Sequence, residues 1–152
     1  MLHKQTFAVS IRYPAREDFG VYFKKEGSLG TSTVRVLVVD DYEPWRRFVC
    51  SALRKRPELE IVGEASDGLE AVQKAQELRP DMILLDVGLP TLNGIEAARQ
   101  LQRLSPESKI LFVSQESSAV VVQDALSTGA CGYVVKATAR DLLSAVNAVL
   151  LA

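Results

Sequence analysis

Short apolar runs alternate with segments of helical period from residue 34 to the end of the chain. The five runs span residues 34–39, 60–65, 82–85, 109–113 and 132–135. Strand-length runs that alternate with helical segments predict repeated βα units, which fold into a parallel sheet covered by helices on both faces. Runs such as VRVLVV and MILL are apolar throughout almost their whole length, which is typical of strands buried on both faces. We therefore expect an α/β fold with a doubly wound, five-stranded parallel sheet and five helices.

The helical segments between these runs carry their own start and stop signals. The first has Pro44 in its first turn, and the second begins after Asp67-Gly68 and ends at Arg79-Pro80. The third follows Asn93-Gly94, and the fourth stops at Gly129. The apolar residues expected to face the core are Trp45, Phe48, Val49, Ala52 and Leu53 in the first helix, Ile95, Ala98, Leu101 and Leu104 in the third, and Leu142, Leu143, Val146, Val149 and Leu150 in the fifth.

Residues 1–33 show no sustained period and mix scattered aromatic residues, glycines and charges of both signs. We interpret them as an N-terminal extension that is flexible and contributes nothing to the core. Residues 34–152 are then one domain, and a domain of about this size can bury roughly two thirds of its unfolded surface.

Composition excludes several classes of protein. Apolar residues make up 47% of the chain and charged residues 24%, which argues against a largely disordered chain. A formal net charge of −1 offers no overall basic surface, so we expect no direct nucleic-acid binding by this chain. Cys50 and Cys131 lie outside any disulfide or zinc spacing and are expected to be small buried residues in a reducing compartment. No apolar run approaches the ~20 residues of a membrane span, so we expect a cytoplasmic location without membrane contact.

Polar residues follow or end four of the five predicted strands. Asp40 and Asp41 follow the first strand, Asp86 the third, Ser114 the fourth and Lys136 the fifth. Binding crevices in open α/β sheets lie at the carboxyl ends of the strands. Three carboxylates, one hydroxyl and one ammonium are therefore expected to meet at one edge of the sheet.

This set of groups favours a divalent cation and phosphoryl transfer. Clustered carboxylates repel one another, and a bound cation relieves that repulsion. Mg²⁺ suits the site better than Ca²⁺ or Zn²⁺, because the site offers a few carboxylate oxygens and neither His nor Cys. Carboxylates, Mg²⁺ and lysine are typical of phosphoryl transfer, since the cations neutralise the moving group and a carboxylate can attack it.

Four motifs occur in order at these strand ends: the acidic pair, LLDVGLP around Asp86, FVS ending at Ser114 and GYVVK ending at Lys136. With them, residues 34–151 resemble the receiver domain of two-component response regulators. The resemblance implies a flavodoxin-like (CheY-like) sheet with strand order 2-1-3-4-5. The stretches GLPTLNGIEAAR and ALSTGACGYVVK are similar to the NarL/LuxR-type branch, whose members usually carry a C-terminal helix-turn-helix domain.

The same resemblance implies a metal and a phosphoacceptor. Asp86 would accept a phosphoryl group from a histidine kinase. Asp41, Asp86 and the backbone carbonyl of Gly88 would bind Mg²⁺ directly, while Asp40 would act mainly through water.

The resemblance also implies a switch. Lys136 would pair with the phosphate, Ser114 would hydrogen-bond a phosphoryl oxygen, and Tyr133 would move inward when that hydroxyl is pulled over. Phosphorylation would then act on a partner or on a transcriptional output domain that lies outside this chain. The resemblance is also compatible with a homodimer of the receiver.

Each residue has a plainer interpretation when it is taken alone. Asp40 could cap the first helix, Ser114 could be a turn residue, Lys136 a solvated charge and Tyr133 a surface aromatic residue. The set favours a site, because chance does not readily place acid, hydroxyl and ammonium at strand ends that share one crevice.

The sequence departs from many receivers at Ala137, where a proline often follows the lysine in a cis peptide. A cis peptide without proline costs about 2.5–4 kcal/mol, so the sequence leaves the Lys136–Ala137 peptide open.

Three competing functions share part of the pattern. A phosphohydrolase of the haloacid-dehalogenase type would carry D-x-D at the nucleophile, but the second residue after Asp86 is Gly88. A degenerate receiver that serves only as an interaction module would lack the acceptor, an acid or the lysine, and all are present. A dinucleotide-binding domain would need G-x-G-x-x-G after the first strand, which the chain lacks. The motifs therefore favour a signalling module over an enzyme.

Overall fold

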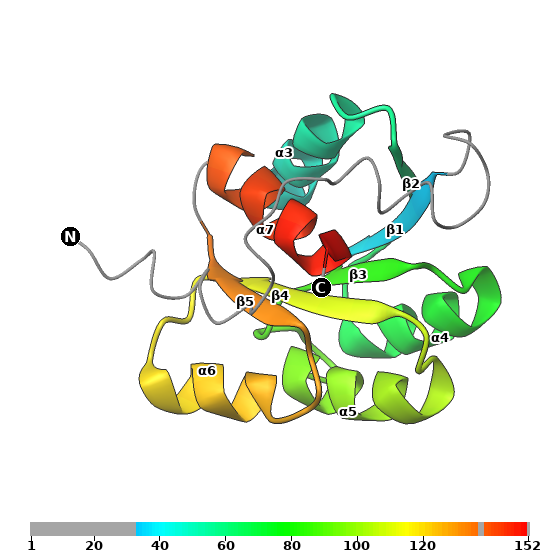
Figure 1. The fold of residues 1–152 in the computed structure, drawn as a ribbon. Helices are drawn as coiled ribbons and strands as arrows, with labels where there is room; N and C mark the ends of the chain where they lie inside the picture. The colour runs from blue at the N-terminus through cyan, green and yellow to red at the C-terminus, as the bar shows by residue number, and fades with distance from the viewer. Residues whose placement is uncertain (1–32, 137–138, 152) are drawn as a thin grey trace.

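The computed structural model describes residues 33–136 and 139–151 of the chain (Figure 1). The predicted extension at residues 1–33, apart from Thr33, and the Lys136–Ala137 peptide lie outside the described residues. The described strands are β1 (Val34–Val39), β2 (Leu59–Ala65), β3 (Met82–Leu85), β4 (Lys109–Ser114) and β5 (Gly132–Val135). The described helices are α3 (Glu43–Arg54), α4 (Gly68–Leu78), α5 (Gly94–Leu104), α6 (Ala119–Leu126) and α7 (Ala139–Leu151).

The strands form one parallel sheet in the order β2-β1-β3-β4-β5, as the sequence predicts. Helices α3 and α7 cover one face of the sheet, and α4, α5 and α6 cover the other (Figure 1). Each face buries its own apolar cluster, with Leu53 and Val146 in one and Phe112 and Leu101 in the other. Burial on both faces explains why the strand sequences are apolar throughout.

Side-chain caps fix the start of three helices. Asp67 accepts a hydrogen bond from the amide of Glu70 at the start of α4, and Ser118 accepts one from Val121 at the start of α6. Asn93 accepts from the first amides of α5. Each cap satisfies an amide that has no partner inside its helix. The predicted breakers at Asp67-Gly68 and Asn93-Gly94 therefore mark helix starts.

The prediction that Leu104 and Phe48 face the core is wrong. Leu104 of α5 is 45% exposed and Phe48 of α3 is 38% exposed. A residue nine positions along a helix lies about half a turn away from the first, so Leu104 points away from the face that holds Ile95. In α3 the buried face includes Cys50, which turns the core side of this helix away from Phe48. Leu143 and Cys131 are only partly buried.

Among the helices described, none combines the length and apolar character needed to cross a bilayer.

Candidate functional site

Parallel register brings the strand ends to one edge of the sheet. Val39 of β1 pairs with Leu85 of β3, so Asp40 and Asp86 are the next residues on neighbouring strands. The amide of Asp86 donates to the carbonyl of Val39 at 3.1 Å, which extends the ladder by one step. On the other side of β3, the amide of Lys136 donates to the carbonyl of Ser114 at 2.8 Å. These backbone bonds place all four side chains at the same end of the sheet.

Three carboxylates gather at this edge. One carboxylate oxygen from each of Asp40, Asp41 and Asp86 lies within 4.8 Å of the others. Asp40 and Asp86 are buried, whereas Asp41 is exposed. Buried carboxylates repel one another strongly unless a cation lies close to them. The arrangement therefore fits a hard divalent cation, and the donor set consists of the oxygen ligands that Mg²⁺ prefers.

Lys136 is the cation that the described residues supply to this cluster. Its Nζ atom lies 2.9 Å from Oδ2 of Asp40 and 3.9 Å from Oδ2 of Asp86. The ammonium also lies 5.4 Å from the centre of the Trp45 ring, within the range of a cation–π contact. The plainer alternative of a solvated charge at this position does not hold, because the side chain is mostly buried and paired.

The loops that carry the acids are fixed by their own side chains. Asp40 accepts a hydrogen bond from the amide of Tyr42, and Asp86 accepts one from the amide of Val87. The residue at the N-cap of α3 is Tyr42, so Asp40 is not the helix cap that it could have been. Behind Asp86, the amide of Gly94 donates to the carbonyl of Val87 at 2.8 Å. A Cβ atom at Gly94 would lie 1.9 Å from the carbonyl oxygen of Asp86, so only glycine allows this close approach.

Ser114 and Tyr133 are joined through the loop that follows β4. The Ser114 hydroxyl accepts a hydrogen bond from the amide of Glu116, as a turn residue would, and the Tyr133 hydroxyl donates to the carbonyl of Glu116 at 2.7 Å. Tyr133 is fully buried and stacks on Phe112, so the plainer alternative of a surface aromatic residue does not hold. Burial raises the pKa of Tyr133 to about 12, so the hydroxyl keeps its proton and remains a donor.

Burial is also the main influence on Asp86. It raises the pKa of this carboxyl above its ordinary value, and the nearby charge of Asp40 raises it further. The ammonium of Lys136 and hydrogen bonds from the Ser114 hydroxyl and the Val87 amide act in the opposite direction. A positive charge brought to this site would favour the ionised form, which is the form that can attack an electrophile.

An open cleft of about 440 Å³ lies over the carboxylates. Its lining includes five of the predicted site residues: Asp41, Asp86, Gly88, Ser114 and Lys136. Gln115 lines it as well. Sequence reasoning missed Tyr42 and Glu116, which complete the rim because they follow strand ends on loops. Most of the predicted residues thus meet at one cavity that is open to solvent, while Asp40 and Tyr133 are buried behind it.

The model of the family described as "Response regulator receiver domain" matches residues 36–147 of the chain. The chain belongs to the response regulator receiver family. The receiver is 38% identical over 116 residues to "Response regulator protein VraR" of Staphylococcus aureus strain Mu3. That match covers 76% of this chain and 56% of VraR, so the chain spans about half the length of this curated relative.

Solved receiver structures agree with this assignment. The signal receiver domain of the putative response regulator NarL from Mycobacterium tuberculosis is 32% identical, with a TM-score of 0.73 over 76% of this chain and 94% of that one. The response regulator domain of Thermotoga maritima CheB is 35% identical, with a TM-score of 0.72 over 78% and 96% of the two chains. A LuxR-family response regulator from Aurantimonas sp. SI85-9A1 is 32% identical, with a TM-score of 0.74 over 78% and 86%.

The chain is thus a CheY-like receiver of the NarL/LuxR branch and part of a two-component response regulator. Receiver domains are in general signalling modules rather than enzymes, and they bind Mg²⁺ at an acidic pocket. They interact with histidine kinases, and LuxR-type regulators carry output domains. In this receiver, Asp40, Asp41 and Asp86 form an acidic cluster.

Proposed function

We propose that Asp86 accepts a phosphoryl group from a phosphohistidine of a histidine kinase. The observation that carries this proposal is the position of the Asp86 carboxylate, which lies on the floor of the cleft between two acids and an ammonium 3.9 Å away. The neighbouring acids supply no competing nucleophile of the same kind. Asp40 is held by Lys136 and by the amide of Tyr42, and Asp41 is exposed at the rim.

The donor set supports a Mg²⁺ site in which Asp41, Asp86 and the carbonyl of Gly88 bind the ion and Asp40 acts through water. All three carboxylates offer oxygens within reach of one another. Gly88 lines the same cleft, and nothing within 4 Å would obstruct a Cβ there, so the space beside it is open. When bound, Mg²⁺ supplies positive charge that offsets the charge of the carboxylates and of the phosphoryl oxygens.

In the proposed transfer, an oxygen of the ionised Asp86 attacks phosphorus and forms an acyl phosphate. The bond from phosphorus to the imidazole nitrogen breaks, and the imidazole leaves with the electron pair and takes up a proton. Lys136 is placed to contact one phosphoryl oxygen, because its ammonium already lies beside Asp86. The Ser114 hydroxyl would donate a hydrogen bond to another.

The same contacts support a switch. A phosphoryl oxygen that accepts a hydrogen bond from the Ser114 hydroxyl would draw this side chain toward Asp86 and away from the amide of Glu116, from which the hydroxyl now accepts. Glu116 is also the partner of Tyr133, so a change in the loop reaches β5 and the helices beside it. We propose that phosphorylation in this way remodels the surface of α6, β5 and α7 for a partner, for a second copy of the chain or for a transcriptional output domain.

The proposed domain boundaries remain residues 1–33 for the extension and 34–152 for the receiver.

Two alternatives use the same geometry. A phosphorylation-independent interaction module is disfavoured because the acceptor, the acids and the ammonium all meet at one cleft. An aspartyl-phosphate phosphohydrolase would need an acid placed to protonate a leaving group, and Gly88 occupies the position where that acid would stand. Incubation with acetyl phosphate separates the three functions. A receiver takes up one phosphoryl group per chain, a phosphohydrolase releases phosphate from many external esters over many turnovers, and an interaction module does neither.

A further inference from the structure

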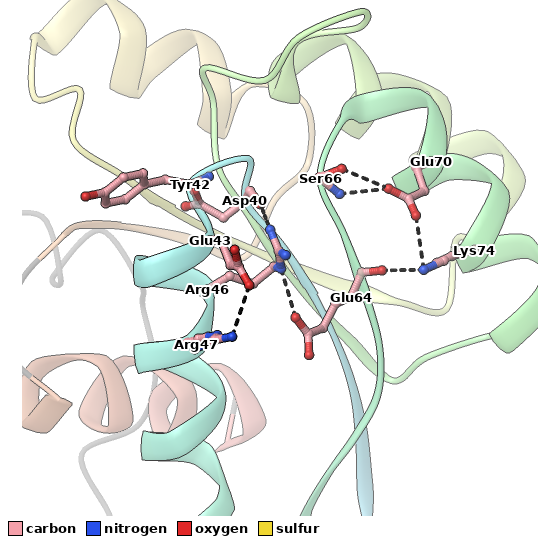
Figure 2. Close-up of polar contacts among 9 residues, drawn as sticks. All are labelled: Asp40, Tyr42, Glu43, Arg46, Arg47, Glu64, Ser66, Glu70 and Lys74. Atoms are coloured by element: carbon pink, nitrogen blue, oxygen red, sulfur yellow. Dashed lines mark hydrogen bonds and ion pairs between the residues drawn. The ribbon is translucent and has the colours of Figure 1, made fainter.

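The side chain of Arg46 connects the end of β1 to the edge strand β2 (Figure 2). Its Nη1 atom donates to the backbone carbonyl of Asp40 at 2.7 Å, and its Nε atom donates to Oε1 of Glu64 at 2.8 Å. The Arg46 side chain is 17% exposed, so both bonds are partly shielded from water. One guanidinium therefore holds two groups that belong to different strands.

The carbonyl of Asp40 belongs to the peptide unit that joins the two acidic residues of the cluster. A peptide unit is planar, so a hydrogen bond to its carbonyl oxygen restrains the orientation of the whole unit between the two Cα atoms. That orientation sets how the side chain of Asp41 is directed relative to that of Asp40. The last pair of the β1–β2 ladder is Val39 with Ala65, so the carbonyl of Asp40 lies beyond the regular pairing and relies on Arg46.

Glu64 is itself braced from the side of α4. The Nζ atom of Lys74 donates to the Glu64 carbonyl and pairs with the carboxylate of Glu70 at 3.1 Å. Glu70 in turn accepts hydrogen bonds from the amide and hydroxyl of Ser66 (Figure 2). The backbone of the residue that orients Arg46 is thus held both by the sheet and by the following helix.

The adjacent arginine has no such role. Arg47 is 76% exposed and pairs with Glu43, one turn away on the same helix, at 3.3 Å. It has the same charge and chemistry as its neighbour, but its ion pair with Glu43 joins two exposed side chains of α3 (Figure 2). Exposed pairs of this kind are typically weak. Arg47 is therefore a matched control within the same turn.

We propose that Arg46 is a positioning residue for the metal site, and that it acts by holding the Asp40–Asp41 peptide in the orientation that directs both carboxylates toward the ion. The inference rests on the proposed Mg²⁺ site. An arginine is needed because its planar guanidinium can donate to the carbonyl of Asp40 and to Glu64 at the same time. A lysine ammonium is a single compact charge that is less able to reach both groups.

The test is a titration of the full chain with MgCl₂, followed by two-dimensional amide NMR. The same spectra report whether each variant is folded. Arg46→Ala should raise the Kd for Mg²⁺ about tenfold, the lower end of the effect that outer partners of metal ligands usually have. Arg46→Lys should recover part of this loss, Glu64→Gln should show a smaller loss, and Arg47→Ala should match the wild type. At saturating MgCl₂, phosphorylation of Arg46→Ala by acetyl phosphate should approach the wild-type rate, because the residue acts through the occupancy of the site.

Several outcomes would overturn the proposal. One is a folded Arg46→Ala variant whose Kd equals that of the wild type, and another is a Kd that changes equally in Arg47→Ala. If Arg46→Ala does not fold, unchanged Kd values in Arg46→Lys and Glu64→Gln would overturn it in the same way. A wild-type chain that binds no Mg²⁺ would overturn both this role and the proposed site. Loss of phosphorylation in Asp86→Asn together with normal Mg²⁺ binding by Arg46→Ala would overturn the positioning role alone.

Discussion

The ammonium nitrogen of Lys136 lies 2.9 Å from Oδ2 of Asp40, although the two residues end strands that are separated by β3 and β4. The same nitrogen lies 3.9 Å from Oδ2 of Asp86. Lys136 therefore has two partners, and it neutralises the acids while it stands where a phosphoryl oxygen would arrive.

Lys136→Met should change metal binding and phosphorylation in opposite directions. Removing the ammonium removes a charge that competes with Mg²⁺ for the acids, so Mg²⁺ should bind roughly threefold to tenfold more tightly, as expected for about 1 kcal/mol between partly screened charges. Phosphorylation by acetyl phosphate should slow by about 100-fold, because a preorganised contact to the moving group is lost. A Mg²⁺ titration and an initial-rate measurement check the two effects.

Lys136→Arg is the control, since it keeps the charge and should leave the affinity for Mg²⁺ near that of the wild type. Weaker Mg²⁺ binding by Lys136→Met, or an undiminished rate, would show that the ammonium does not have this double role.

Asp86→Asn should stabilise the metal-free chain at neutral pH. Burial and the charge of Asp40 raise the pKa of Asp86 in the folded state. A raised folded pKa means that the stabilising contribution is present at low pH and is lost as the pH rises through that pKa, so the ionised carboxylate costs stability at pH 7. We expect the melting temperature of Asp86→Asn to exceed that of the wild type by a few degrees, since ~1 kcal/mol corresponds to roughly 3–5 °C for a domain of this size.

The gain should shrink as the pH falls from the raised pKa of the folded state toward the ordinary pKa of an aspartic acid, and it should vanish below that value, where the wild-type side chain is neutral in both states. Thermal melts in EDTA from pH 4 to pH 8 measure the difference. A difference that does not vary with pH would mean that Asp86 is not the group responsible.

The fold followed from the sequence because a parallel sheet buried on both faces leaves apolar runs that cannot be mistaken for surface strands. The predicted strands differ from β2 and β4 by one residue at one end and agree with the other three. Helix faces were harder to predict, because a helix end or a shifted core face changes which apolar residue is buried. Leu104 and Phe48 show this, since both were predicted to face the core and both lie at the surface.

The candidate site followed from one rule, that the carboxyl ends of parallel strands meet. That rule brings Asp40, Asp86 and Ser114 together without any knowledge of their contacts. It gives no signal for Arg46 or for the contact between Trp45 and Lys136, because these depend on where long side chains reach from the first turn of α3. A side chain that bonds a backbone carbonyl leaves no period and no motif in the sequence.

Ser114→Ala should separate phosphorylation from its structural consequence. The acceptor carboxylate and the metal ligands remain, so Asp86 should still be phosphorylated. The bond between Ser114 and the amide of Glu116 is lost in every state, so the loop can no longer exchange it for a phosphoryl oxygen. Amide NMR with and without beryllofluoride, a stable phosphoryl mimic, should show large shifts at residues 115–136 in the wild type and small ones in the variant. If these residues do not shift in the wild type, the proposed switch is wrong.

Deletion of residues 1–32 should leave thermal stability nearly unchanged. Residues 1–32 show no sustained apolar period, and among the described residues both apolar clusters are made from Val34 onward. The melting temperature should therefore change by less than about 5 °C, which corresponds to roughly 1 kcal/mol for this size. A larger drop in a calorimetric melt would show that the extension packs on the receiver.

The most direct measurement is the intact mass of the full chain after incubation with acetyl phosphate and MgCl₂, followed by borohydride trapping and peptide mapping. Asp86 is the buried acid on the floor of the cleft beside Lys136, so the wild type should gain one phosphoryl group and the trapped residue should be Asp86. Asp86→Asn and the wild type in EDTA should gain none. A phosphoryl group on any other residue, or undiminished labelling of Asp86→Asn, would contradict the assignment of Asp86 as the phosphoacceptor.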